Sequence, residues 1–137
     1  MAFVFTKSDP QVEQLLPQLE IKGDAQVTTV YIPGAALQVT KQGTTAEIIY
    51  GRRVELFRGI GLLAEHSHED TYCCTQNARF TMNGVMLDCS RNAVSTVDSV
   101  KQWIDLTADM GYNCLMLYTE DTWEVDDNPY FGYMRGR

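Results

Sequence analysis

The chain has 137 residues, of which 45% are hydrophobic and 21% charged, and its formal net charge is −7. This composition is typical of one globular domain, or of one small domain with part of another, and it excludes disordered and collagen-like chains. The negative charge argues against nucleic acid as a partner, because phosphate binding needs clustered positive charge, and no apolar run reaches the ~20 residues of a membrane-spanning helix.

Residues 1–81 predict a small α+β domain, a sheet with helices. A first helix is expected to begin at Pro10, with Ser8 or Asp9 as its N-cap, and to end early near Pro17. A second helix is expected over residues 53–66, where apolar residues recur at helical spacing. Strands are expected at residues 2–6, 27–32, 36–41, 45–50 and 71–80, with a hairpin turn at Gly43.

Residues 82–137 have a different pattern. The apolar runs 85–89 and 114–118 are typical of strands that are buried on both faces. Between them, Ser95 or Thr96 is the expected N-cap of a helix that ends near Met110, and Gly111 follows as a left-handed C-cap. Strand, helix and strand over this length predict a βαβ unit with parallel strands.

Two parallel strands and one helix cannot cover both faces of a parallel sheet. Either this unit joins the sheet of residues 1–81, or it begins a longer structure. Residues 119–137 show no further helix or strand period, so we favour a truncated chain. The uncovered edge and the aromatic tail then predict self-association of the isolated chain.

The cysteines are expected to be buried free thiols, because a chain this long can build a core without disulfides. Free thiols and the absence of a signal-peptide pattern at residues 1–7 predict a cytoplasmic protein. His66 and His68 near these cysteines match no zinc pattern and are expected at the end of the second helix, so we expect neither a metal nor a cofactor. The cysteines are Cys73, Cys74, Cys89 and Cys114.

Polar and aromatic residues follow both strands of the βαβ unit, where parallel α/β proteins bind their ligands. Guanidinium, carboxylate and aromatic groups together suit a polyol, but the same residue types also serve as ordinary turn and cap residues. Spacing alone leaves both interpretations open. The set is Asp88, Arg91, Tyr118, Glu120, Asp121 and Trp123. A second group, Arg52, Arg53 and Arg58, is expected to form a solvated helix face rather than a ligand site.

Residues 83–92 have the sequence NGVMLDCSRN, and residues 113–121 have the sequence NCLMLYTED. With the helix between them, these segments resemble the opening of the catalytic barrel of family-20 glycoside hydrolases, the β-N-acetylhexosaminidases, whose first strand has the pattern Gly, three hydrophobic residues and Asp-x-Ser-Arg. Residues 128–137 are similar to compact bacterial members of that family. Residues 1–80 match more loosely the small α+β domain that precedes the barrel.

The resemblance implies that residues 82–137 are the first strand, first helix and second strand of a (β/α)₈ barrel. It implies a parent enzyme that removes terminal N-acetylglucosamine or N-acetylgalactosamine by substrate-assisted, retaining catalysis. Arg91 would hold hydroxyls of the terminal N-acetylhexosamine, and Asp88 would brace Arg91. Glu120 and Asp121 would line the mouth of the site. Many relatives carry a Trp-His pair and paired aspartates near this second strand end, and this chain has the sequence YTED instead.

The family's general acid and orienting carboxylate form an adjacent Asp-Glu pair after the fourth strand. No Asp-Glu dipeptide occurs in the 137 residues, so no catalytic residue is predicted and the chain alone is expected to be inactive. The alternative is a self-contained, non-catalytic α/β domain that binds a ligand or partner. A nucleotide site is disfavoured because no Gly-rich loop follows Asp88, and thiol-redox chemistry because there is no Cys-x-x-Cys.

Overall fold

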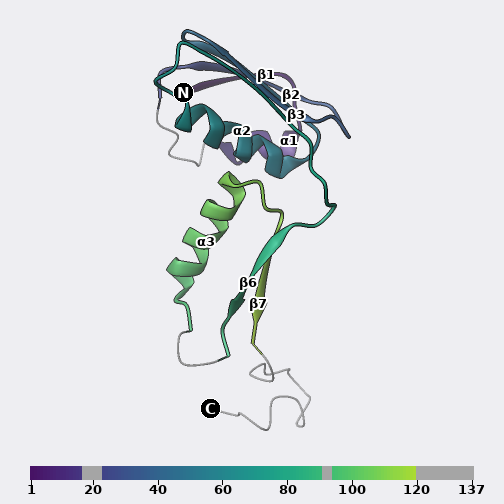
Figure 1. Ribbon diagram of the computed structural model, residues 1–137, viewed down its shortest axis with the longest axis vertical. Coiled ribbons are helices and arrows are strands. Elements are labelled where there is room, and N and C mark those ends of the chain that lie inside the picture. Colours follow the sequence, from purple (N-terminus) through teal and green to yellow (C-terminus); the bar gives the residue numbers. More distant parts are fainter. Residues whose placement is uncertain (17–22, 91–93, 120–137) are drawn as a thin grey trace.

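The computed structural model describes residues 1–16, 23–90 and 94–119, which form two connected units (Figure 1). The first unit is a mixed sheet with helices, which confirms the predicted α+β domain. The second unit is a strand, a helix and a strand. The first contains β1 (Ala2–Lys7), α1 (Pro10–Glu13), β2 (Gln26–Tyr31), β3 (Leu37–Gln42), β4 (Thr45–Tyr50), α2 (Arg53–Glu65) and β5 (Thr71–Gln76); the second contains β6 (Gly84–Asp88), α3 (Val97–Asp109) and β7 (Cys114–Tyr118). None of the described helices is long and apolar enough to cross a membrane.

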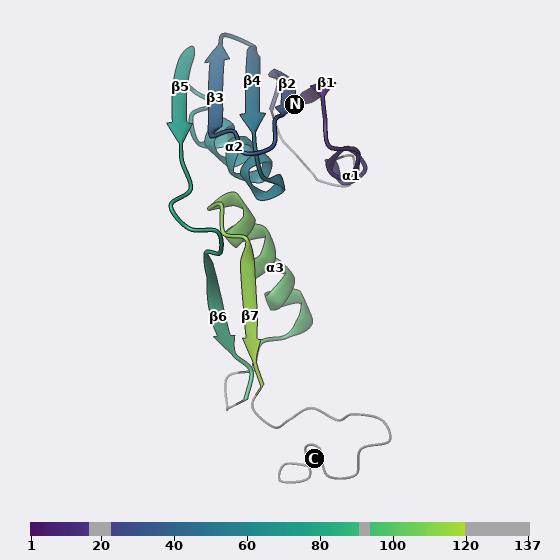
Figure 2. The same cartoon turned by 90° about the vertical axis from the view of Figure 1, so that its right-hand side faces the viewer.

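The first sheet has the strand order β1-β2-β4-β3-β5. Strands β1, β2 and β4 are parallel, whereas β3 is antiparallel to both of its neighbours, β4 and β5. The β3–β4 hairpin turns at Gly43, whose φ of +56° is in the left-handed region that favours glycine. Helices α1 and α2 lie on the same face of the sheet (Figures 1 and 2).

The core lies between this sheet and α2. Alternate residues of β3 and β4 are buried, as expected for strands with one covered face, and they pack against the apolar side of α2. Gly59 lets α2 approach closely, because a Cβ at that position would lie 2.8 Å from Cγ2 of Ile48. The fully buried side chains include Val12, Val27, Leu37, Val39, Ile48, Tyr50, Leu56 and Leu63.

Buried charged side chains hold both ends of α2. At the N-terminus, Oε2 of Glu55 accepts hydrogen bonds from the backbone N–H groups of Gly51 at 3.0 Å and Arg52 at 2.8 Å. At the other end, Lys41 is 8% exposed and its Nζ donates to the carbonyl of Ser67 at 2.8 Å and to that of Glu69. The Glu55 bonds satisfy backbone N–H groups at the N-cap of α2 and just before it, and the Lys41 bonds satisfy carbonyls of the turn that follows the helix.

The short helix α1 is held through its N-cap. Asp9 accepts a hydrogen bond from the backbone N–H of Gln11 at 3.0 Å through Oδ1, and its Oδ2 lies 2.5 Å from Nε of Arg53. The hydrogen bond from Arg53 lowers the pKa of Asp9 even though burial opposes this shift. Asp9 therefore links the segment before β2 to the first turn of α2.

The second unit is the predicted βαβ unit. Strands β6 and β7 are parallel and form a sheet of their own, so the unit does not join the first sheet. Thr96 is the N-cap of α3 and accepts a hydrogen bond from the backbone N–H of Ser99 at 3.2 Å. Gly111 follows the helix with φ +83°. The α3 helix covers one face of the two strands, and its C-terminal end lies next to α2 (Figures 1 and 2).

The prediction that both strands are buried on both faces is wrong for this chain. Met86 is 61% exposed and its partner in the register, Met116, is 53% exposed. Because paired residues point to the same face of a sheet, these two side chains share the face that α3 does not cover. The helix itself also leaves apolar side chains exposed. Ile104 is 50% exposed, Leu106 52% and Trp103 38%.

Two smaller predictions also need correction. The strand expected at residues 71–80 ends at Gln76, because residues 77–83 leave the sheet and connect the two units. The four cysteines are free, but they are not buried. Cys73 is exposed and the other three are half-buried, because β5 is an edge strand and the second sheet is covered on one face.

Lys41, on β3, bonds to the turn after α2 and gives a test of this packing. We expect Lys41→Met to lower the free energy of unfolding by about 1–3 kcal/mol, because part-buried carbonyls lose a charged donor. Urea denaturation measures the change. Lys101→Met, on α3 with its side chain 69% exposed, is the matched control and should change the free energy by less than about 0.5 kcal/mol. Equal losses in the two variants would contradict this role of Lys41.

Candidate functional site

The strand-end site predicted from the sequence lies at the end of the βαβ unit that is far from the first sheet (Figure 1). Asp88 ends β6 and Tyr118 ends β7, and the two residues are partners in the parallel register. The backbone N–H of Cys89 donates to the carbonyl of Tyr118 at 2.7 Å, one residue beyond β6. The structure therefore brings together the carboxyl ends of the two strands, as expected.

The Asp88 side chain shapes the chain where it leaves β6. Its Oδ1 accepts a hydrogen bond from the backbone N–H of Ser90 at 2.8 Å and another from Oγ of Ser90 at 2.6 Å. This is the side-chain-to-backbone bond of an Asx turn, which replaces the ladder bonds that the chain gives up at a strand end. Asp88 thus fixes the turn between the end of β6 and Ser90.

Four residues of the predicted set, Arg91, Glu120, Asp121 and Trp123, lie outside the described residues. Their part in a site stays a prediction, and so does the bracing of Arg91 by Asp88. Among the residues that the structure describes, no group of three or more His, Cys, Asp or Glu could hold a metal ion.

Hydrogen exchange tests the turn at Asp88. We expect the Ser90 amide to exchange several-fold faster in Asp88→Ala, because loss of one hydrogen bond removes roughly 0.5–1.5 kcal/mol of local protection. Asp88→Asn keeps an oxygen in the same place and should exchange like the unaltered chain. Equal exchange rates in the Ala and Asn variants would contradict the role of the Asp88 side chain.

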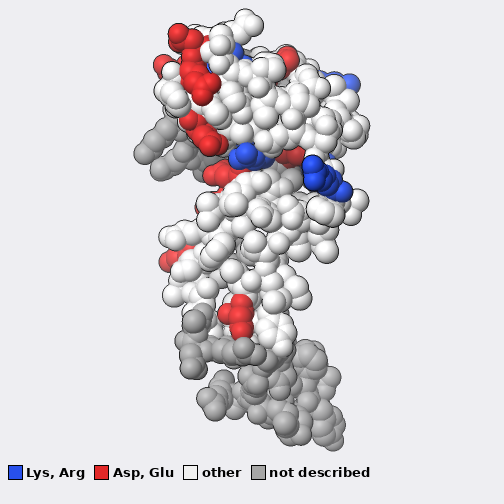
Figure 3. All heavy atoms as spheres, in the orientation of Figure 1, with Lys and Arg blue, Asp and Glu red and all other residues white. Residues whose placement is uncertain are grey.

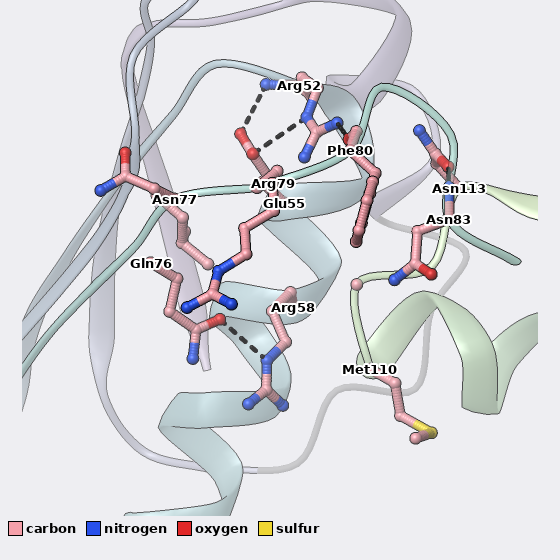
Figure 4. A pocket seen from close by; sticks show the side chains of 13 residues that line it. Arg52, Glu55, Arg58, Gln76, Asn77, Arg79, Phe80, Asn83, Met110 and Asn113 are labelled. Atoms are coloured by element: carbon pink, nitrogen blue, oxygen red, sulfur yellow. Dashed lines mark hydrogen bonds and ion pairs between the residues drawn. The ribbon is translucent and has the colours of Figure 1, made fainter.

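The structure contains a second candidate site, which the sequence did not predict. It is a cavity of about 320 Å³ at the junction of the two units, between α2, the end of β5, residues 77–83 and the turn after α3 (Figure 4). It lies at the opposite end of the βαβ unit from Asp88. The residues that line it come from four separated parts of the sequence, so no local motif indicates it.

Arg52 and Arg58 lie at this junction and do not form the solvated helix face that the sequence predicts. Arg52 contacts Glu55 through Nε at 3.1 Å and donates through Nη1 to the carbonyl of Phe80 at 3.1 Å. Arg58 donates through Nε to Oε1 of Gln76 at 3.3 Å and through Nη1 to the carbonyl of Asp109 at 3.2 Å. These bonds join α2 to the connecting segment, to β5 and to α3.

The histidine pair lies where it was predicted, at the end of the second helix. His66 is the C-cap residue of α2, and its Nδ1 lies 2.7 Å from Oε1 of Glu69. Its ring stacks on that of Tyr72 with a centroid distance of 3.9 Å. The hydrogen bond with His66 lowers the pKa of Glu69. These contacts are structural and hold the turn between α2 and β5.

No protein-family model and no curated protein matches the chain. Solved structures do match, and those compared are β-N-acetylglucosaminidases or β-N-acetylhexosaminidases of glycoside hydrolase family 20. The exo-β-N-acetylglucosaminidase of Vibrio harveyi, in complex with N-acetylglucosamine, has a TM-score of 0.63 at 17% identity over 88% of this chain and 22% of its own.

Two further family-20 structures agree with this match. A β-N-acetylglucosaminidase has a TM-score of 0.61 at 22% identity over 87% of this chain and 26% of its own. The β-N-acetylhexosaminidase of Streptomyces coelicolor A3(2) has a TM-score of 0.58 at 18% identity over 88% of this chain and 31% of its own. The chain thus has the fold of a part of these enzymes, and it spans between about a fifth and a third of their length.

Proposed function

We propose that this chain is the N-terminal part of a family-20 glycoside hydrolase, an exo-β-N-acetylhexosaminidase. One observation carries the proposal: the sequence LDCSR, which resembles the family's first barrel strand, begins at Leu87 in β6, in a chain whose fold matches family-20 enzymes over 88% of its length. The fold match does not depend on close sequence similarity, since the matches are only 17–22% identical in sequence.

In this proposal residues 1–81 are the α+β domain, and residues 82–137 begin a (β/α)₈ barrel. The uncovered face of β6 and β7 supports it. A barrel interior is filled by layers of side chains, each layer coming from alternate strands, and the side chains of Met86 and Met116 would point into that interior. The exposed apolar residues of α3, among them Ile104 and Leu106, would pack against neighbouring helices of the outer ring.

The sugar site would lie at the carboxyl ends of the strands. Arg91 would donate hydrogen bonds to hydroxyls of the terminal N-acetylhexosamine, which its planar fork of N–H donors suits. Asp88 is then a positioning residue, because its bond to Ser90 sets the path of the chain into Arg91. Glu120 and Asp121 follow Tyr118 and would line the mouth of the barrel.

The substrate would be a glycoconjugate that ends in N-acetylglucosamine or N-acetylgalactosamine. Its own acetamido group would attack the anomeric carbon, with retention of configuration. The general acid and the carboxylate that orients the acetamido group would come from polypeptide beyond residue 137, since these residues contain no Asp-Glu pair. The chain alone is therefore inactive in this proposal, which includes a cytoplasmic location and no cofactor.

The alternative function is a self-contained, non-catalytic domain that binds a ligand or partner. The cavity at the junction favours it, because described residues alone form that cavity. The length of the protein that the gene encodes separates the two functions. A reading frame that continues for two hundred or more codons and includes an adjacent Asp-Glu pair supports the enzyme, and a stop codon after Arg137 supports the binding domain.

The role of Arg91 is testable in the protein purified at the full length that its gene encodes. We expect Arg91→Ala to lower kcat/KM for a chromogenic N-acetyl-β-glucosaminide by about 10- to 100-fold, because a hydrogen bond from a charged donor contributes roughly 1.5–3 kcal/mol. Lys101→Ala, on the exposed side of α3, is the control and should leave the rate unchanged. Unchanged kcat/KM in Arg91→Ala, or turnover by residues 1–137 alone, would contradict the proposal.

The uncovered apolar surface predicts the behaviour of residues 1–137 in isolation. We expect the isolated chain to self-associate, because Met86, Met116 and the apolar residues of α3 are exposed together. Sedimentation velocity should show an average mass that rises with concentration. A monomer at every concentration up to about 1 mM would contradict this expectation.

A further inference from the structure

We propose that the cavity at the junction of the two units binds a small organic oxyanion of monosaccharide size, a sugar sulfate or a sugar acid. This site is separate from the strand-end site, since β6 runs between them for five residues, or about 16 Å. The proposal does not depend on the glycosidase function, because every residue that lines the cavity belongs to the described part of the chain.

The charges around the cavity favour an anion. Three guanidinium groups and a single carboxylate line it, in a chain whose net charge is −7. The carboxylate, Glu55, is already bonded to Arg52 and to two backbone N–H groups. Figure 3 shows basic side chains at the junction, with acidic ones beside them and over the first unit. An oxyanion in the cavity would therefore meet the guanidinium of Arg79, which pairs with no carboxylate among the described residues.

Two arginines supply this charge. Arg79 makes no hydrogen bond or ion pair with any residue in the described part of the chain. Arg58 uses Nε and Nη1 for Gln76 and Asp109, which fixes its side chain and leaves its Nη2 without a described partner. Figure 4 shows both side chains extending to the part of the cavity where the Gln76 amide lies. A planar or tetrahedral oxyanion suits two such forked donors.

The remaining walls suit the polar body of a sugar. Amide side chains of Gln76, Asn77 and Asn83 line the cavity and can both donate to and accept from hydroxyls. The Phe80 ring, 68% exposed, lies at the same cavity and offers a flat face to the C–H side of a pyranose. A volume of about 320 Å³ is at the lower end of the range for ligand pockets, which fits one sugar unit.

Isothermal titration calorimetry tests the proposal with the protein at the full length that its gene encodes. The probes are glucose 6-sulfate, glucuronate, glucose and inorganic sulfate. They lack an acetamido group, so they do not report on the hexosaminidase site. The variants are Arg79→Gln and, as a matched control that removes one positive charge elsewhere, Lys101→Gln. Arg79 is exposed, so its substitution leaves the core intact.

We expect glucose 6-sulfate or glucuronate to bind at one site per chain, at least tenfold more tightly than glucose and inorganic sulfate. Arg79→Gln should weaken this binding tenfold or more, and Lys101→Gln should change it less than twofold. If glucose 6-sulfate binds more tightly than glucuronate, the ligand class is a sugar sulfate. If glucuronate binds more tightly than glucose 6-sulfate, the ligand class is a sugar acid. No binding, equal binding of glucose or inorganic sulfate, or equal losses in both variants would overturn the proposal. Binding or its absence in this titration does not affect the test of Arg91, because that test measures hydrolytic activity.

Discussion

A parallel pair of strands has to be covered on both faces, and the residues that the structure describes cover only one face of β6 and β7. Helix α3 packs on that face, and the opposite face presents Met86 and Met116 to solvent. The first sheet does not cover this opposite face, because β6 and β7 form a separate sheet below it (Figure 1). The uncovered face is the physical reason why we propose that the second unit begins a larger barrel.

Polar contacts position the second unit relative to the first. Arg58 on α2 bonds to the carbonyl of Asp109 at the end of α3. Asn113, just before β7, accepts through Oδ1 from the backbone N–H of Asn83 at 2.8 Å and donates through Nδ2 to the carbonyl of Thr81 at 2.8 Å. These bonds align the starts of β6 and β7 and place the connecting residues 77–83 along one side of the cavity. The binding proposal therefore depends on the same contacts that join the two units.

Much of the secondary structure could be predicted from local signals. The α2 and α3 helices have regular apolar spacing, and Asp9 and Thr96 are the caps that the sequence had offered with Ser8 and Ser95 as alternatives. The placement of β4 between β2 and β3 could not be predicted, because strand order depends on contacts between distant residues. The burial of β6 and β7 was predicted wrongly, since an apolar run indicates what a strand can bury and not what is present to cover it.

The two candidate sites also differ in how far the sequence could predict them. Asp88 and Tyr118 were predictable, because residues that follow parallel strands meet at one edge of the sheet. Arg58 and Arg79 were not, since their proximity arises only from the packing of α2 against α3 and the path of residues 77–83. Their spacing of 21 positions matches no motif, and Lys41 at the end of α2 was missed for the same reason.

Methionine oxidation tests most directly the claim that β6 and β7 begin a barrel. Dilute hydrogen peroxide is added to the protein at the full length that its gene encodes, and mass spectrometry follows the oxidation rates of Met86, Met116 and Met82. Met82, 72% exposed in the connecting segment, is the internal reference. We expect Met86 and Met116 to oxidise at least tenfold more slowly than Met82, because further strands and side chains of the proposed barrel would bury them. Oxidation of all three at similar rates would show that nothing covers this face, and would contradict the barrel.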